Sequence, residues 1–179
     1  MNRRLKRVLV LSLYFLLILV FVLLLVKFVG QKIQVNGTSM SPTLDDKDQL
    51  LVDKISYRFS DPDRFDIIVF PYKYEKDTYY IKRIIGLPNE TVFIDSEGKI
   101  YINGELLEEG YGKEIIIDPG RAYEEIQLAE DEYFVLGDNR NNSSDSRDPN
   151  IGNIKRDQIM GRAFMRVYPF NKLGMIKHK

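Results

Sequence analysis

An apolar run near the N-terminus constrains this chain more than any other feature. Residues Val8–Val26 are apolar except for Ser12, and they follow a basic segment, Met1–Arg7. At 1.5 Å per residue, a helix of this length spans about 28 Å, close to the thickness of the hydrocarbon core of a bilayer. We therefore predict one transmembrane helix at residues 8–29.

A cleaved secretory signal is the competing interpretation of this run. Its apolar core would be shorter, about 7–15 residues, and it would end at a cleavage site with small residues. Here the run leads into the sequence K-F-V-G-Q-K at residues 27–32, which has no A-x-A pattern. The positive-inside rule then predicts a single-pass protein of the cell membrane, with residues 1–7 cytoplasmic and residues 30–179 forming an extracytoplasmic domain.

The charge balance and the scarcity of cysteine and histidine argue against several kinds of site. Lys plus Arg equals Asp plus Glu at 26 each, so we expect no nucleic-acid partner. Cysteine is absent, and the one histidine, His178, lies in a terminal K-H-K where we expect it to be solvated. The acidic cluster Asp45, Asp46 and Asp48 fits no metal-binding loop, and we interpret it as a solvated turn. No metal and no cofactor are therefore expected.

The rest of the chain has the pattern of short strands separated by turns. We expect strands at residues 49–54, 66–70, 79–85, 91–95, 99–102, 115–117, 126–128, 132–136 and 161–170. Asn103-Gly104 is a strong hairpin signal, and residues 137–153 form a polar loop. The predicted fold is mostly β, with packed antiparallel sheets or a partly open barrel, and residues 86–132 form a small β excursion from it.

A turn just after the apolar run places one serine hydroxyl in a defined position. In Val35–Leu44, Gly37 can adopt backbone angles that other residues avoid, and Pro42 restricts both itself and Ser41. An ordinary polar turn between an anchor and a domain is the alternative interpretation. The turn becomes a candidate for catalysis, with Ser39 exposed as the nucleophile, only if a base lies nearby.

The strand at residues 79–85 carries a candidate base. Lys82 lies in an apolar strand and shares one face with Tyr80 and Ile84. It is either a lysine that extends its amine to solvent, or a desolvated lysine whose pKa lies roughly 3 units below its usual ~10.4. In the second case, a neutral amine beside Ser39 would make a pair of nucleophile and base without histidine.

These residues resemble the type I signal peptidase family, the membrane-bound Ser/Lys endopeptidases, in four motifs that follow one another in order. Ser39–Leu44 is similar to the family's S-M-x-P-T-L and Arg64–Phe70 to its R-G-D-[IV]-[IV]-V-F. Tyr80–Pro88 matches its lysine motif, and Gly137–Arg147 matches its G-D-N-R-x-N-S-x-D-S-R. The short chain with one anchor looks like the compact enzymes of Gram-positive bacteria.

The sequence departs from the family pattern at three places. Phe65 replaces the usual Gly, and Asn89-Glu90 replaces Gly-Asp, where Asn tolerates left-handed backbone angles. Gly37 stands where some relatives carry a serine that helps bind the oxyanion. A second oxyanion contact at Gly37 would therefore have to come from the backbone.

The resemblance implies a role for each motif residue. Ser39 would be the nucleophile, its own amide N–H would stabilise the oxyanion, and Lys82 would be the general base. Ser143 would orient the Lys82 amine by a hydrogen bond. The remaining supporting residues would be Asp145 and Arg147, paired with each other to hold the loop, together with Asp138 and Arg140.

The resemblance also implies the substrate and the partners. Signal peptides of exported preproteins would add as an extended strand between Ile33–Gly37 and Tyr79–Lys82, and cleavage would follow small residues of A-x-A type. The lipid bilayer would be the second partner. Two other interpretations remain open at this point: a self-cleaving Ser/Lys protease of the repressor type, which shares the chemistry and a related β fold, and an anchored β domain that binds partners without catalysis.

Overall fold

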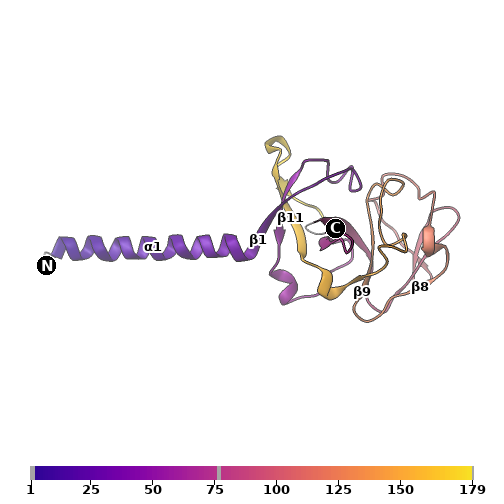
Figure 1. The fold of residues 1–179 in the computed structure, drawn as a ribbon, viewed down its shortest axis with the longest axis horizontal. Coiled ribbons are helices and arrows are strands. Elements are labelled where there is room, and N and C mark those ends of the chain that lie inside the picture. The colour runs from indigo at the N-terminus through magenta and orange to yellow at the C-terminus, as the bar shows by residue number, and fades with distance from the viewer. Residues whose placement is uncertain (1–2, 76–77, 179) are drawn as a thin grey trace.

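A long N-terminal helix leads directly into a β domain (Figure 1). This computed structural model describes residues 3–75 and 78–178, apart from the side chains of Arg3 and residues 21–29. Helix α1 covers Arg3–Val29, and strand β1, Gly30–Gln34, follows it without a break. A helix is thus present where the anchor is predicted. Among the described residues, however, no helix combines the length and the apolar character that crossing a membrane requires.

The larger sheet is antiparallel. Lys82 lies on one of its strands, and Ser39 lies in a turn that joins two of its strands. Its strands run in the order β1-β2-β11-β3-β4-β9-β10, and β12 pairs with β11. Beyond β1, their bounds are Gln49–Asp53 (β2), Ile67–Pro71 (β3), Tyr79–Gly86 (β4), Glu132–Leu136 (β9), Ile154–Lys155 (β10), Gly161–Tyr168 (β11) and Gly174–Met175 (β12). The sheet does not close into a barrel, and the predicted mostly β, antiparallel fold is confirmed.

A second, smaller sheet lies at the end of the molecule away from α1, where β8 is labelled in Figure 1. Its order is β7-β6-β5-β8, with β5 at Thr91–Ile94, β6 at Ile100–Ile102, β7 at Glu105–Leu106 and β8 at Ile126–Gln127. The predicted hairpin between β6 and β7 is confirmed: Asn103 and Gly104 have φ of 52° and 80°, as a two-residue hairpin turn requires.

The part of the chain that the structure describes contains four short 3-10 helices: η1 at Ser56–Arg58, η2 at Gly120–Tyr123, η3 at Arg156–Gln158 and η4 at Phe170–Lys172. The last predicted strand ends early, at Tyr168, because Pro169 lacks an N–H donor and η4 begins after it.

The strand predicted at residues 115–117 is wrong. Ile115 and Ile117 are 74% and 81% exposed, and none of the described strands pairs with them. The side chain of Asn141 holds this segment instead, since its Oδ1 accepts the Ile117 N–H at 3.0 Å and its Nδ2 donates to the Ile115 carbonyl at 2.9 Å. A run of isoleucines therefore forms an extended loop rather than a strand.

Buried residues on both faces of β4 fix it in place. On one face, Ile81 packs with Val35 and Met40 in a core under the nucleophile turn, and Ile85 packs in the core between the two sheets. On the other face, Ile84 packs with Ile68 and Val135. Every residue of β4 from Ile81 to Gly86 is buried. Because cores of this kind are close-packed, the side chains that project from β4 have little freedom to move.

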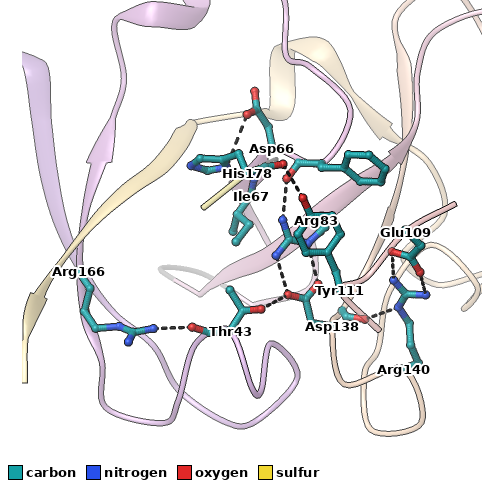
Figure 2. A network of polar contacts seen from close by, with 12 residues as sticks. Thr43, Asp66, Ile67, Arg83, Glu109, Tyr111, Asp138, Arg140, Arg166 and His178 are labelled. Atoms are coloured by element: carbon teal, nitrogen blue, oxygen red, sulfur yellow. Dashed lines mark hydrogen bonds and ion pairs between the residues drawn. The ribbon is translucent and has the colours of Figure 1, made fainter. Parts of the chain in front are cut away.

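The C-terminal tail is ordered, so the expectation that His178 is solvated is wrong. Its Nδ1 accepts the Ile67 N–H at 3.1 Å and lies 3.5 Å from Asp66 Oδ1, as Figure 2 shows. Tyr111 donates its hydroxyl to the His178 carbonyl at 3.1 Å. Burial lowers the pKa of His178, and the Asp66 carboxylate opposes this shift. The tail is held because Ile176 is buried in the main core and β12 pairs with β11.

Candidate active site

Ser39 lies in a tight turn that is anchored on both sides. Gly37 has φ of +93° and donates its N–H to Asp46 Oδ1 at 2.8 Å, which fixes the start of the turn. Met40 and Leu44 are buried, and the Leu44 N–H donates to the Met40 carbonyl at 2.8 Å. The peptide bond between residues 41 and 42 is cis. Apolar anchors at residues 40 and 44 thus hold the turn while the half-buried Ser39 faces a groove.

Lys82 projects from β4 toward this turn. Its Nζ lies 2.7 Å from Ser39 Oγ and donates to the Ile81 carbonyl at 3.1 Å. Only 3% of the residue is exposed, so the interpretation of Lys82 as a lysine reaching solvent does not apply. The strand and the turn together place an amine within hydrogen-bonding distance of a hydroxyl, which is the geometry that nucleophile activation requires.

Burial makes the Lys82 amine a usable base. Removal from water lowers its pKa from 10.5 to about 8, although the negative charges of Asp145 and Asp138 oppose this shift. The ring of Tyr80 lies 5.1 Å from the amine. Because a pKa near 8 leaves a substantial neutral fraction at mildly alkaline pH, Lys82 can accept a proton there.

The loop that follows β9 packs against the nucleophile turn. Asn139 donates its N–H to the Ser39 carbonyl at 3.0 Å and its side-chain amide to the Thr38 carbonyl at 3.1 Å. Gly137 has no room for a side chain, because a Cβ there would lie 2.5 Å from the Ser39 carbonyl oxygen and 2.2 Å from Ser143 Oγ. The loop therefore fixes the position of the Ser39 turn.

The expected pair between Asp145 and Arg147 is formed. Asp145 Oδ1 accepts from Arg147 Nε at 2.8 Å, and its Oδ2 accepts from Arg147 Nη2 at 2.9 Å and from the Gly137 N–H at 3.1 Å. Arg147 also donates from Nη1 to the Asp118 carbonyl at 3.0 Å. The pair thus joins the end of β9, the polar loop and the segment near η2.

Asp138 and Arg140 bind different partners, not each other (Figure 2). Asp138 pairs with Arg83 at 2.7 Å, and Arg140 pairs with Glu109 at 2.5 Å. Thr43 donates its hydroxyl to Asp138 at 2.5 Å.

The hydrogen bond predicted between Ser143 and Lys82 is not formed in this structure. The Ser143 hydroxyl is buried and has no hydrogen-bond partner among the described residues. It packs against Gly137 instead, at the edge of the groove that also contains Ser39 and Lys82.

The candidate oxyanion donor is the amide of Ser39. Its N–H donates to no acceptor within the described residues, so it is available to a substrate oxygen. The N–H of Gly37 is already committed to Asp46, and we therefore find no second donor at Gly37.

An open groove of about 830 Å³ contains Ser39 and Lys82. Residues 31–40 line one side and residues 78–82 the other, and residues 141–144 close the end next to the nucleophile. Both walls carry unpaired strand edges. The outer edge of β1 has no partner among the described strands, and β9 pairs with β4 only at residues 83–86. Within the described chain, no group of three His, Cys, Asp or Glu residues is placed to hold a metal ion.

Comparison with known proteins gives one consistent family. The sequence profile described as "Signal peptidase, peptidase S26" matches residues 7–168. The chain belongs to this family. It is therefore a serine protease of the signal peptidase I group, and the predicted enzyme class is confirmed. The match favours this family over the self-cleaving repressor type.

Two named relatives agree with this assignment, and one solved structure is similar in sequence. The chain is 41% identical to a probable signal peptidase I-2 of Synechocystis sp., over 83% of this chain and 68% of that protein. It is 34% identical to signal peptidase I U of Bacillus subtilis, over 98% and 95% of the two chains. A crystal structure of a signal peptidase I from Enterococcus faecalis is 35% identical and aligns with a TM-score of 0.48, over 57% of this chain and 97% of that one.

The backbone angles at two positions show why the family usually has glycine where this chain does not. Phe65 and Asn89, at positions where the family usually has glycine, have φ of +71° and +65°. Glycine reaches such angles freely, and asparagine reaches them more easily than most residues. Asn89 is thus a mild replacement, whereas Phe65 adopts a backbone conformation that is unfavourable for a bulky residue.

Four residues that contact the candidate site or its supports were not predicted from the sequence: Arg83, Thr43, Glu109 and Tyr111. The guanidinium of Arg83 lies 3.7 Å from the centre of the Tyr111 ring, and it donates to the Phe65 carbonyl at 2.9 Å. A charged residue inside an apolar strand was the one available signal, since such a charge must find a buried partner. Nothing in the sequence indicates that Glu109 and Tyr111, from the smaller sheet's loops, reach the site.

Proposed function

We propose that this chain cleaves signal peptides from exported preproteins, with Ser39 as the nucleophile and Lys82 as the general base. One observation carries the proposal: a buried amine with a pKa of about 8 lies 2.7 Å from a serine hydroxyl, in a groove with two free strand edges. Membership in the signal peptidase family supplies the substrate class.

The reaction follows from the positions of these groups. Neutral Lys82 removes the Ser39 proton as the oxygen attacks the scissile carbonyl, and the Ser39 N–H donates to the oxygen that becomes negative. The Lys82 ammonium then protonates the leaving amine, and an acyl group remains on Ser39. Neutral Lys82 next activates a water, which releases the signal peptide as a carboxylic acid.

The polar loop supports this pair. Asp145 with Arg147, Asp138 with Arg83, and Arg140 with Glu109 hold the loop against β4 and the nucleophile turn. We retain Ser143 as the residue that orients the Lys82 ammonium, because its buried hydroxyl has no partner and lies at the same groove.

The substrate binds as an added strand between β1 and β4. Successive backbone groups of a strand point to opposite sides, so the groups of Tyr79 and Ile81 face away from β3 and into the groove. Val35, Met40 and Ile81 are buried and line the groove, so its floor is apolar next to the substrate. An apolar floor favours small apolar side chains such as alanine over charged ones, which supports cleavage after A-x-A.

The apolar sequence of Val8–Val26 supports a membrane location, with residues 1–7 on the cytoplasmic side. Since β1 follows α1 directly, the groove begins within a few residues of the helix end. A catalytic domain held there meets signal peptides at the point where they leave the bilayer.

The test is cleavage of a purified A-x-A precursor in detergent or lipid, with the cut located by mass spectrometry. Wild type should cut after the second alanine, and Ser39→Ala and Lys82→Ala should show no activity above background. Ser96→Ala and Lys155→Ala, at exposed positions outside the groove, serve as matched controls and should behave as wild type. A wild type that is inert on several precursors would favour the anchored binding domain, and activity in Lys82→Ala would exclude the mechanism.

A further inference from the structure

A second groove, of about 680 Å³, lies on the far side of the catalytic loop from the first. It is lined by residues from 117–121 and from 140–149. Asn141 and Ser143 line both grooves, so the two adjoin at these residues of the loop that also borders Ser39. None of the proposed catalytic steps uses this second groove.

The direction in which the substrate lies indicates which part of it reaches the second groove. The first groove runs from Gln31, next to α1, to Ser39 and Lys82, so the signal peptide lies along it on the side of the helix. The polypeptide beyond the cleaved bond must leave in the opposite direction, past residues 141–144. The second groove begins there, and the smaller sheet beside it lies at the end farthest from α1 (Figure 1).

Specific hydrogen bonds hold one wall of the second groove in place. Asn141 binds the backbone of residues 115 and 117 at 2.9 and 3.0 Å, as a neighbouring strand would. These bonds present the side chain of Ile117, 81% exposed, at the groove, whereas Ile115, 74% exposed, does not line it. An exposed isoleucine fixed at the rim of a groove offers apolar contact to a passing chain.

The buried hydroxyl of Ser143 is a second indication of a ligand. Most buried hydroxyls have a hydrogen-bond partner, and this one, at the junction of the two grooves, has none. In the proposed mechanism the oxygen of this hydroxyl accepts from the Lys82 ammonium, which leaves its proton free. A substrate backbone carbonyl that passes from one groove to the other can accept that proton.

We propose that the second groove binds the first residues of the mature protein, those just beyond the cleaved bond, and that Ile117 is a specificity-determining contact for them. This inference rests on the proposed function. The enzyme then recognises residues on both sides of the bond that it cleaves. Binding energy from the residues of the mature protein helps to position the scissile carbonyl.

The test uses internally quenched peptides with one constant A-x-A signal side and one, two, four or six residues beyond the bond. For wild type, kcat/KM should rise about tenfold from one residue to four, a factor that corresponds to one well-placed side-chain contact. Ile117→Ser should remove most of this gain and leave the shortest peptide unaffected. Ile115→Ser is the matched control and should keep the full gain.

Each outcome separates this inference from the proposed function. If wild type cleaves all peptides at one rate, or if both variants lose the gain equally, the second groove is not a substrate site, although the signal peptidase activity stands. If Ile117→Ser slows the shortest peptide as much as the longest, its role is structural and the inference is wrong. If wild type cleaves none of the peptides, the proposed function and this inference both fail.

Discussion

Arg83 and Asp138 form an ion pair in which neither side chain has any exposed surface. Two parallel bonds join them, from Nε to Oδ1 at 2.9 Å and from Nη2 to Oδ2 at 2.7 Å, and Thr43 adds a third bond to Asp138 (Figure 2). Arg83 follows Lys82 along β4, and Asp138 follows Gly137, which touches the Ser39 carbonyl. The pair therefore fixes β4, which carries Lys82, relative to the loop after β9, which supports the Ser39 turn.

Replacing Asp138 with Asn should destabilise the fold strongly. The change leaves the Arg83 charge buried without a compensating charge, which typically costs about 3–5 kcal/mol of the free energy of unfolding. Thermal unfolding followed by circular dichroism measures the effect. Asp131→Asn breaks the exposed contact with Lys155, 3.7 Å long, and should change the melting temperature little. Equal melting temperatures for the two variants would show that the buried pair does not hold the domain together.

The pH dependence of cleavage should report the Lys82 amine. Burial lowers the pKa of Lys82 from 10.5 to about 8, and only the neutral form accepts the Ser39 proton. Below pH 8 the protonated form dominates, so kcat/KM should fall about tenfold for each pH unit and should level off above pH 8. Lys155→Met, which removes an exposed lysine, should leave the profile unchanged. A profile that keeps rising to pH 10 would mean that the amine is not desolvated in solution.

Gly137→Ala should reduce the cleavage activity much more than it reduces the stability of the fold. The new Cβ would lie 2.5 Å from the Ser39 carbonyl oxygen, a backbone atom that moves only with the nucleophile turn. A displacement of about 1 Å at a catalytic group costs on the order of 100-fold in rate. We expect kcat to fall by at least about that factor in the cleavage assay. At Gly110 a Cβ would meet nothing within 4 Å, so Gly110→Ala is the control. Full activity of Gly137→Ala would contradict the close contact.

Local sequence patterns predict the elements that carry the candidate site. Strand alternation indicates that Lys82 is surrounded by apolar neighbours, and the turn residues around Ser39 indicate a fixed hydroxyl. Asn103-Gly104 specifies a hairpin from two residues alone. Each of these features depends on residues close together in the chain.

The choice of long-range partners could not be predicted in the same way. The sequence does not show that Asp138 binds Arg83 rather than Arg140, because the chain has many basic residues. Only the sheet order, which places β4 next to β9, brings Arg83 to Asp138. His178 looks like part of a solvated tail, yet it binds the N–H of Ile67, 111 residues earlier in the chain. Residues 115–117 have strand composition, but no strand within residues 3–75 and 78–178 pairs with them.

Phe65 offers a test of backbone strain that does not depend on catalysis. Its φ of +71° is left-handed, and its ring packs 5.1 Å from that of Tyr111, at the edge of the core between the sheets. Substitution by Ala or by Gly removes the same ring. Only Gly adopts the left-handed angle freely, so Phe65→Gly should be more stable than Phe65→Ala by about 1 kcal/mol.

The control for this comparison is Phe59, which is 86% exposed and has an ordinary φ of −121°. At such a position Ala is normally the more stable residue by about 0.4–1 kcal/mol, because Gly gives the unfolded chain more freedom. The order of the two variants in thermal unfolding should therefore reverse between residues 65 and 59. If Ala is the more stable choice at both positions, the backbone at Phe65 is not left-handed in solution, and the family's glycine there has another cause.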